Sequence, residues 1–500
     1  MRSFRGGALH AGPRDTPERL WRGGVETLLI PLKLVRDQPL QQQLYDQLRE
    51  LIATARLQPG TRMPSTRMLA EQFSISRITA LLTYERLIAE GYLQTLPAKG
   101  TFVARGPIAP TPDCPTASAP AALSGKPDPS ASVTIGQPDP ALFPAGRWRA
   151  LTRGALDRFG ARLACEHASG HPRLRAAIAG WLSTSRGLAV APDQIILVNG
   201  RQQALHLVTH LLLRPGARAV VEDPCDPRAA AAFTSVGATL ARISVDADGL
   251  CTGLLPPGRS ALVHVTPEHQ RPLGVALTAK RRAALLEWAG RAGAVVVEED
   301  CEGELRYHGM DVPPLMAMDR SEHVILVGGF HCSLGPWLSL GFMAVPLRLI
   351  PAALAARRLT DDSTRWLEET ALAEFLMSGG YARHLHRLGK AYASRRDALV
   401  AALRQHFGES TPIWGSGAGL HLSWGPPGCV GPLGGLARLA RQCGLEAASP
   451  VTEGSRNAGP AGQALLLGFG SAPEMQIGSR VAQFAAALRD GRAGNAIGAD

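Results

Sequence analysis

The sequence predicts two domains of different fold class: a small α+β domain with a helix-turn-helix and a hairpin, and a much larger α/β domain with a mostly parallel sheet. Three observations lead to this expectation. Helical periodicity with turn signals fills the first hundred residues. Apolar runs of strand length alternate with helix-like stretches after residue 133. The segment between them is rich in Pro, Ala and Ser and too poor in large apolar residues to bury a core.

These patterns set the expected domain boundaries. We expect a basic N-terminal tail at residues 1–30, the helix-turn-helix domain at 31–104, a Pro/Ala/Ser-rich linker at 105–132, the α/β domain at 133–490 and a C-terminal tail at 491–500. The formal net charge of +11 suits an anionic partner. No stretch has the apolar length of a membrane span or a signal peptide, so we expect a cytoplasmic protein. The eight cysteines form neither C-x-x-C pairs nor Cys/His clusters, so we expect no metal site and no disulfide framework.

The small domain reads as three helices in succession. Apolar residues recur at helical spacing from Leu40 onward, which predicts an amphipathic first helix. Pro64 and Ser65 open a second helix. After a tight turn, Ser76 is a suitable N-cap for a third helix over residues 77–90, which stops at Gly91.

A β-hairpin is expected directly after the third helix. Residues 92–95 and 101–103 alternate as strands around a Pro-Ala-Lys-Gly turn at 97–100, which completes a winged helix-turn-helix. Such a domain places its third helix in the major groove of double-stranded DNA. We expect Ser76, Arg77 and Thr79 to reach base edges or flanking phosphates. The DNA backbone would be held by Arg67 on the second helix and by Lys99 and Gly100 at the wing tip.

The small domain resembles the GntR-type DNA-binding domain. The resemblance rests on LQPGTRMPSTRMLA at 57–70, SISR at 74–77, EGY at 90–92 and KGTF at 99–102. It implies operator DNA as the partner, with Arg67, Arg77 and Lys99 at positions that the family uses for contact.

In the large domain, five apolar runs suit buried strands of a parallel sheet. They cover residues 194–198, 219–221, 261–265, 294–297 and 324–327. Ligands of such sheets bind where the strands end at their carboxyl edge. The turns after these runs are therefore the expected place for a site.

These turns resemble the fold-type I aminotransferase body of the MocR subfamily of GntR regulators. The resemblance spans roughly residues 136–488 and rests on GQPDPALFP at 136–144, NGRQQA at 199–204, VEDP at 221–224 and TPEHQRPLG at 266–274. It implies a fold-type I domain that dimerises, and pyridoxal phosphate (PLP) as the family's cofactor.

Several positions that hold PLP in the family have changed here. Cys332 stands at the place of the Schiff-base lysine, beside His331, and a thiol forms no imine. The family's carboxylate and phenol align with Glu299 and Cys301. Asp226 replaces the stacking aromatic residue and Ser339 the phosphate-clamping arginine. We therefore expect no covalently bound cofactor.

What remains of the cofactor cleft is expected to be a backbone cradle at Gly200, Arg201 and Gln202. His269 is expected to be a structural hydrogen-bonding residue, and Asp226, Glu299 and Ser339 to favour a cationic or neutral ligand over a phosphate. The arginine that binds the substrate carboxylate in aminotransferases has no clear counterpart, and Arg456 is only a guess.

We interpret the chain as a homodimeric, DNA-binding transcription regulator with a degenerate, non-catalytic aminotransferase-like domain that binds an unidentified small effector or serves dimerisation. Two alternatives stay open. The chain could be a working PLP-dependent aminotransferase fused to a DNA-binding domain, or a PLP-sensing regulator with a non-standard site.

Overall fold

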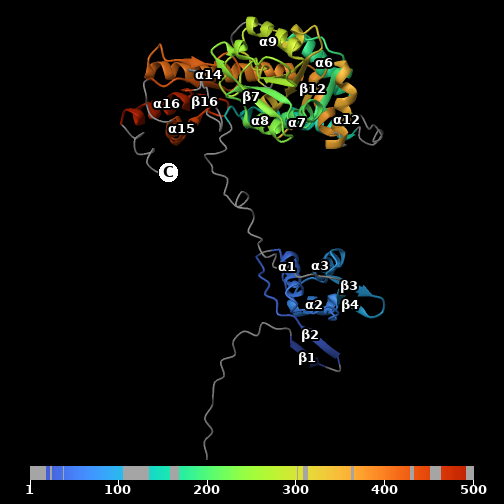
Figure 1. The fold of residues 1–500 in the computed structure, drawn as a ribbon. Helices are drawn as coiled ribbons and strands as arrows, with labels where there is room; N and C mark the ends of the chain where they lie inside the picture. Colours follow the sequence, from blue (N-terminus) through green and yellow to red (C-terminus); the bar gives the residue numbers. More distant parts are fainter. Residues whose placement is uncertain are drawn as a thin grey trace, which may run out of the picture. The chain divides into compact units, whose positions relative to one another are not determined.

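The computed structural model describes residues 18–22, 25–37, 39–104, 135–157, 168–300, 302–307, 313–361, 365–427, 433–450 and 463–490. The chain divides into two compact units, Met1–Lys126 and Pro127–Asp500, and Figure 1 shows the helix-turn-helix in the first and the large sheet in the second. The expected linker at 105–132 and C-terminal tail at 491–500 lie outside the described residues. No helix in the described ranges combines the length and the apolar character that a membrane span needs.

The first unit contains a helix-turn-helix. Its helices are α1 (Leu40–Ala53), α2 (Thr66–Phe73) and α3 (Arg77–Ala89). Ser65 caps α2 by accepting a hydrogen bond from the Met68 N–H at 3.2 Å. Ser74 adopts a left-handed backbone (φ 52°) and ends α2, which makes the tight turn before α3. Apolar side chains from all three helices form one core, which includes the buried Leu48, Leu69 and Leu87.

The expected wing follows α3. Strands β3 (Leu93–Leu96) and β4 (Gly100–Val103) pair antiparallel, with Leu93 opposite Val103. The segment before α2 lies against β4, because Met63 N–H donates to Thr101 O and Val103 N–H donates to Thr61 O, both at 2.9 Å. The winged helix-turn-helix is thereby confirmed.

The segment expected to be a basic tail contains an additional hairpin. Strands β1 (Glu18–Arg22) and β2 (Val25–Leu29) pair antiparallel, with Glu18 opposite Leu29. In the sequence the two strands are separated by Gly23 and Gly24, a pair typical of two-residue hairpin turns, which our interpretation of residues 1–30 overlooked.

The second unit is built on an eight-stranded mixed sheet with the order β5-β12-β11-β10-β9-β6-β7-β8. Its strands are β5 (Ile195–Val198), β6 (Arg218–Asp223), β7 (Thr239–Asp246), β8 (Gly249–Leu250), β9 (Leu262–Val265), β10 (Val295–Asp300), β11 (Val324–Gly329) and β12 (Gly341–Ala344). Strands β11, β10, β9, β6 and β7 are parallel to their neighbours, whereas β12 is antiparallel to β11 and β5, and β8 to β7. The expected fold class, with a mostly parallel sheet, is confirmed.

Helices cover both faces of this sheet, which explains why its strands are apolar on both sides. Val221 and Val297 pack with α7 (Gly200–Leu212), α8 (Pro227–Thr234) and α12 (Ile350–Thr360). Their neighbours Val220 and Val296 pack with α9 (Ala279–Ala292) on the opposite face. Figure 1 shows α7 and α8 below the sheet and α9 above it.

A smaller antiparallel sheet completes the second unit. Its order is β13-β14-β16-β15, formed by β13 (Ile413–Trp414), β14 (His421–Trp424), β15 (Glu446–Ala448) and β16 (Leu465–Gly468). It shares a core with α14 (Gly380–Phe407), α15 (Leu433–Gln442) and α16 (Glu474–Arg489). The remaining helices are α5 (Ala145–Asp157), α6 (Pro172–Arg186), α10 (Leu315–Met318), α11 (His331–Leu334) and α13 (Trp366–Met377).

Candidate functional site

The start of α3 carries the side chains that the sequence assigns to base contact, with Ser76 and Arg77 exposed and Thr79 half-buried. Ser76 is the N-cap, and its hydroxyl accepts from the Thr79 N–H at 3.0 Å and lies 2.8 Å from the Thr79 hydroxyl. Arg77 is exposed and follows directly. Ser76 and Thr79 therefore serve first to shape the helix end, while Arg77 is free to reach outward.

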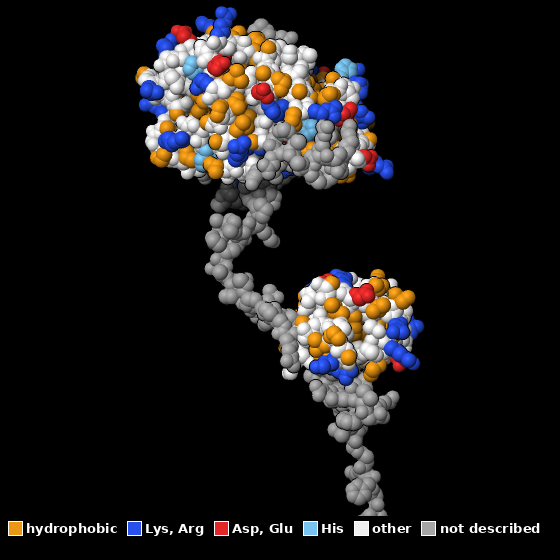
Figure 2. Space-filling view, turned by 90° about the vertical axis from the view of Figure 1, so that its right-hand side faces the viewer, with side chains coloured by type: hydrophobic (Ala, Val, Ile, Leu, Met, Phe, Trp, Pro, Cys, Tyr) orange, Lys and Arg blue, Asp and Glu red, His pale blue; other side chains and the backbone are white. Residues whose placement is uncertain are grey.

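An apolar stripe on α3 was not expected. Ile78, Leu81 and Leu82 are 68%, 44% and 42% exposed. Figure 2 shows hydrophobic side chains on the visible face of the small unit with Lys and Arg side chains near its rim. Exposed apolar side chains on a recognition helix suit contact with thymine methyl groups.

The wing carries Lys99 and Gly100, both exposed. Gly100 has φ +107°, a backbone that favours glycine, and a Cβ there would lie 3.5 Å from Nε of Arg62. Arg62 forms an isolated bridge with Phe102 and is also exposed, so it stands beside the wing tip. Arg62 belongs to the motif at residues 57–70, but the sequence did not indicate a role for it.

Arg67 is exposed on α2 and makes a hydrogen-bonded ion pair with Glu71, one turn further on, at 3.0 Å. The side chains of both residues are more than 60% exposed, so solvent screens this pair. Breaking the Arg67–Glu71 ion pair costs little free energy, so Arg67 is available to contact a DNA phosphate.

The large unit has a cavity of about 330 Å³ at the carboxyl ends of its parallel strands. Among its lining residues are Asn199, Gly200, Arg201, Gln202, Arg228, Arg271, His331, Cys332 and Ser339. Three arginines thus line the cavity, and no carboxylate does among the described lining residues. Arg228 and Arg271 were not among the residues that the sequence indicated.

The Arg201 side chain forms ion pairs with Asp226 and Glu299, whereas the sequence led us to expect only a backbone contribution from Arg201. Its Nη1 lies 2.9 Å from Oδ2 of Asp226, and its Nε donates to Oε1 of Glu299. His264 Nε2 lies 3.0 Å from the other oxygen, Oε2, of Glu299. Both Glu299 oxygens are therefore occupied by partners within the protein.

The charges of these carboxylates are neutralised in place. Burial acts to raise the pKa of Glu299, but the Arg201 charge and the His264 hydrogen bond outweigh it and hold the pKa well below its usual value. Burial likewise opposes ionisation of Asp226, whose pKa is nevertheless lowered by Arg201 and Arg228. Asp226 also caps α8 through the Arg228 N–H at 2.8 Å.

The turn at the lysine position follows β11 as the short helix α11. Cys332 is 2% exposed, and burial raises the pKa of its thiol well above the usual value, so the thiol stays protonated. Burial, assisted by the Arg271 charge, lowers the pKa of His331 to about 4. A protonated, buried thiol beside a neutral imidazole is a poor nucleophile.

No lysine of the second unit lies among the described residues that line the cavity. In the sequence this unit contains only Lys280 and Lys390. They lie on α9 and α14, are exposed, and are absent from the described lining of the cavity. Ser339 does line it, whereas Cys301 and Arg456 lie outside the described residues.

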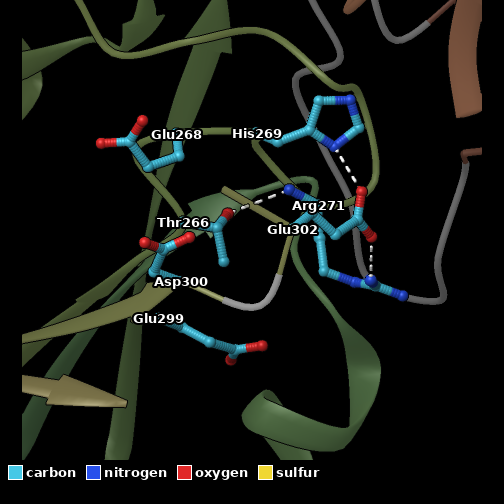
Figure 3. A pocket seen from close by; sticks show the side chains of 7 residues that line it. All are labelled: Thr266, Glu268, His269, Arg271, Glu299, Asp300 and Glu302. Carbon is cyan, nitrogen blue, oxygen red and sulfur yellow. Dashed lines mark hydrogen bonds and ion pairs between the residues drawn. The ribbon is translucent and has the colours of Figure 1, made fainter. Parts of the chain in front are cut away.

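A second cavity, of about 10 Å³, shares Arg271 with the first, and Figure 3 shows the residues that line it. Among the residues that line it are His269, Arg271 and Glu302. His269 Nε2 lies 3.2 Å from Gly415 O, and its Nδ1 lies 2.8 Å from Oε2 of Glu302. His269 thus contacts a backbone carbonyl, and it also belongs to a buried cluster that the sequence does not reveal.

Two family models match the chain. The model "Bacterial regulatory proteins, gntR family" matches residues 40–103, and the model "Aminotransferase class I and II" matches residues 135–422. The two matched ranges correspond to the winged helix and to most of the large unit. The large cavity lies within the second match.

Curated relatives combine both parts. The probable rhizopine catabolism regulatory protein MocR of Rhizobium meliloti is 35% identical over an alignment of 405 positions, which covers 77% of this chain and 81% of the relative. The HTH-type pyridoxine biosynthesis transcriptional regulator PdxR of Corynebacterium glutamicum is 33% identical, over 75% of this chain and 81% of the relative. The solved multiple substrate aminotransferase of Thermococcus profundus is similar with a TM-score of 0.64 and 25% identity, covering 71% of this chain and 90% of that one.

Proposed function

We propose that the aminotransferase-like cleft of this chain is a non-catalytic receptor for a small anion. The chain belongs to the MocR-like regulators of the gntR family, which join a helix-turn-helix to an aminotransferase-like domain. The chain is a DNA-binding transcription regulator, and double-stranded operator DNA is its partner. We place it in the cytoplasm, where operator DNA lies.

The observation that carries the proposal is the Arg201 bridge between Asp226 and Glu299. A pyridine nitrogen would need a free oxygen on Glu299, and Arg201 and His264 hold both oxygens. An imine would need an amine where Cys332 stands. The residues present therefore do not fit PLP, and we assign no step of catalysis to the cleft.

The same residues suit a small anion held without a covalent bond. Arg201, Arg228 and Arg271 line the cavity. Each also pairs with a carboxylate outside the lining, but the Arg228 side chain is 58% exposed and keeps room to contact an anion. The N-terminus of α7 meets the cavity at Gly200, and its N-cap Asn199 supplies no side-chain cap, which leaves N–H groups for an anion. This lining argues against our expectation of a cationic or neutral ligand, because the two carboxylates on which that expectation rested already have partners within the protein. Asp226 pairs with Arg201 and Arg228, and Glu299 pairs with Arg201 and His264.

A thermal unfolding series tests the ligand class. The probes are inorganic phosphate, succinate and the dication putrescine at equal ionic strength. A ligand that binds the folded state raises the unfolding temperature. We expect phosphate or succinate to stabilise the chain and putrescine to have no effect.

Two variants tie the result to the cleft. Arg228→Ala should abolish the stabilisation, since Arg228 lines the cavity. Arg291→Ala, which removes an arginine 64% exposed on α9, should leave it unchanged. Stabilisation by putrescine alone, or an anion effect that survives Arg228→Ala, would overturn the proposed ligand class.

A further inference from the structure

Three buried side chains from separate parts of the second unit converge beside the small cavity. His269 follows β9, Glu302 follows β10, and His421 is the first residue of β14 in the smaller sheet. They are 4%, 3% and 2% exposed. One ligand-type atom from each lies within 4.8 Å of the others. The described part of the chain shows no other such group of three.

The hydrogen bonds of the two rings determine where each carries its proton. His269 Nε2 lies 3.2 Å from Gly415 O, and His421 Nε2 lies 2.9 Å from Pro272 O. A carbonyl oxygen only accepts, so each Nε2 must donate. In its neutral form each ring therefore presents an unprotonated Nδ1.

Both Nδ1 atoms face the same carboxylate oxygen. Oε2 of Glu302 lies 2.8 Å from Nδ1 of His269 and 3.7 Å from Nδ1 of His421. None of these three atoms has a well-directed hydrogen bond among the described residues, although the 2.8 Å separation is that of an ion pair. Three buried lone pairs that point at one another repel, so a positive species must lie between them.

We propose that His269, Glu302 and His421 bind a divalent transition-metal ion of the zinc class through Nδ1, Oε2 and Nδ1. Two imidazoles and a carboxylate suit zinc and not Mg²⁺ or Ca²⁺, which prefer oxygen ligands. Metal bonds of about 2.0–2.2 Å in a tetrahedral site separate the ligand atoms by about 3.3 Å, between the two distances to Oε2.

The surroundings match those of metal sites in two respects. Ligand histidines typically donate their other N–H to a backbone carbonyl, as both rings do here. The remaining Glu302 oxygen, Oε1, accepts from Arg271 Nη1 at 2.5 Å, which orients the carboxylate (Figure 3). The adjacent cavity of about 10 Å³ has the size of one water molecule, the expected fourth ligand.

A proton on His269 is the competing way to separate the lone pairs, and it requires no metal.

The ion would connect the two sheets of the second unit. His269 and Glu302 belong to the large sheet's carboxyl edge and His421 to the smaller sheet. Gly419 has φ +75°, and a Cβ there would lie 2.3 Å from Oε2 of Glu302, so the chain passes as close to the cluster as glycine permits. We therefore infer a structural role, like that of a cross-link.

The test uses the tag-free full-length chain in a background that removes a competing site. His206 and His210 are both exposed on α7, with their Nε2 atoms 3.0 Å apart, and such a pair binds metal by itself. The background is therefore His206→Gln with His210→Gln. Protein loaded with zinc and dialysed should retain about one equivalent per chain by elemental analysis. Co²⁺ in place of zinc should give intense visible absorption bands, as a tetrahedral site does.

Variants assign the ion to the cluster. His421→Gln and Glu302→Gln should each lose the retained zinc and the cobalt bands, with circular dichroism to verify folding. If these variants do not fold, the background chain still tests the proposal. Zinc should raise its unfolding temperature, whereas Mg²⁺ should not. A folded background chain that retains no zinc would overturn the proposal and favour a proton on His269. Undiminished zinc in folded His421→Gln would also overturn it.

Discussion

At the scale of single residues, the sequence indicated which residues line the cleft, but it did not indicate which partners their side chains contact. Cys332 could be placed at the lysine position because its neighbours in the chain mark the turn. The direction of the Arg201 side chain could not be predicted, since its partner Glu299 lies 98 residues away in the sequence. The His269–Glu302–His421 cluster was hidden for the same reason: its members meet only when the two sheets pack together.

Two single substitutions distinguish base reading from backbone contact. Arg77→Ala should weaken operator binding by about 1–3 kcal/mol and relax base preference at the contacted position. Lys99→Ala should weaken binding to all DNA sequences. It should also reduce the slope of log affinity against log salt concentration by about one. Both are measured by fluorescence anisotropy against an operator selected from random DNA. Unchanged affinity and preference for Arg77→Ala would show that α3 docks differently.

A buried carboxyl group gives the second unit a pH dependence of known sign. Burial raises the pKa of Glu222 to about 7, although hydrogen bonds from Thr266 and Gln270 oppose this. The unfolded chain releases this proton near pH 4.5, so the contribution to stability is complete below that pH and is lost as pH rises through about 7. Between these two pH values, the contribution of Glu222 to the free energy of unfolding decreases by up to about 1.4 kcal/mol per pH unit.

Glu222→Gln should remove this part of the slope, as measured by urea unfolding from pH 5 to 8. The matched control is Glu287→Gln, which alters a carboxylate 70% exposed on α9 and should leave the slope as it was. An identical slope in Glu222→Gln would mean that Glu222 is ionised in the folded protein.

Among the helices and strands, the sequence predicted those whose signals lie within a short stretch of the chain. The three helices and the wing of the first unit follow from caps and turns, and the five buried strands follow from short apolar runs. Strand direction is not local, so the antiparallel insertion of β12 between β11 and β5 could not be seen in the sequence. The β1–β2 hairpin was missed because its sequence was interpreted by charge alone.

The two N-caps of the helix-turn-helix allow a matched comparison. Ser65→Ala and Ser76→Ala each remove one hydroxyl that accepts from a helix N–H, and each should destabilise the first unit by about 1 kcal/mol. Only Ser76→Ala should also lower operator affinity, because Ser76 begins the recognition helix. Thermal unfolding and anisotropy measure the two effects. Equal losses of affinity would contradict the assignment of α3 as the reading element.

At the scale of the whole molecule, the chain joins a DNA-binding winged helix to an aminotransferase-like domain. We propose that internal ion pairs of Arg201 take the place of cofactor contacts in this domain. We propose that the chain acts as a homodimer, since a two-fold regulator can occupy a palindromic operator with two readers. Light scattering after size exclusion should then give about twice the 53.0 kDa of one chain. A mass of one chain at micromolar concentration would contradict this.

Whether the cleft binds PLP covalently is tested by titrating the full-length chain with PLP and measuring absorbance, borohydride reduction and intact mass. An active class I aminotransferase serves as the positive control. We predict no saturable imine band and no mass increase, because no amine lines the cleft among the described residues and Arg201 and His264 occupy Glu299. A reducible adduct at a single site, formed at micromolar PLP, would contradict the account and restore the PLP-sensing or enzymatic alternative.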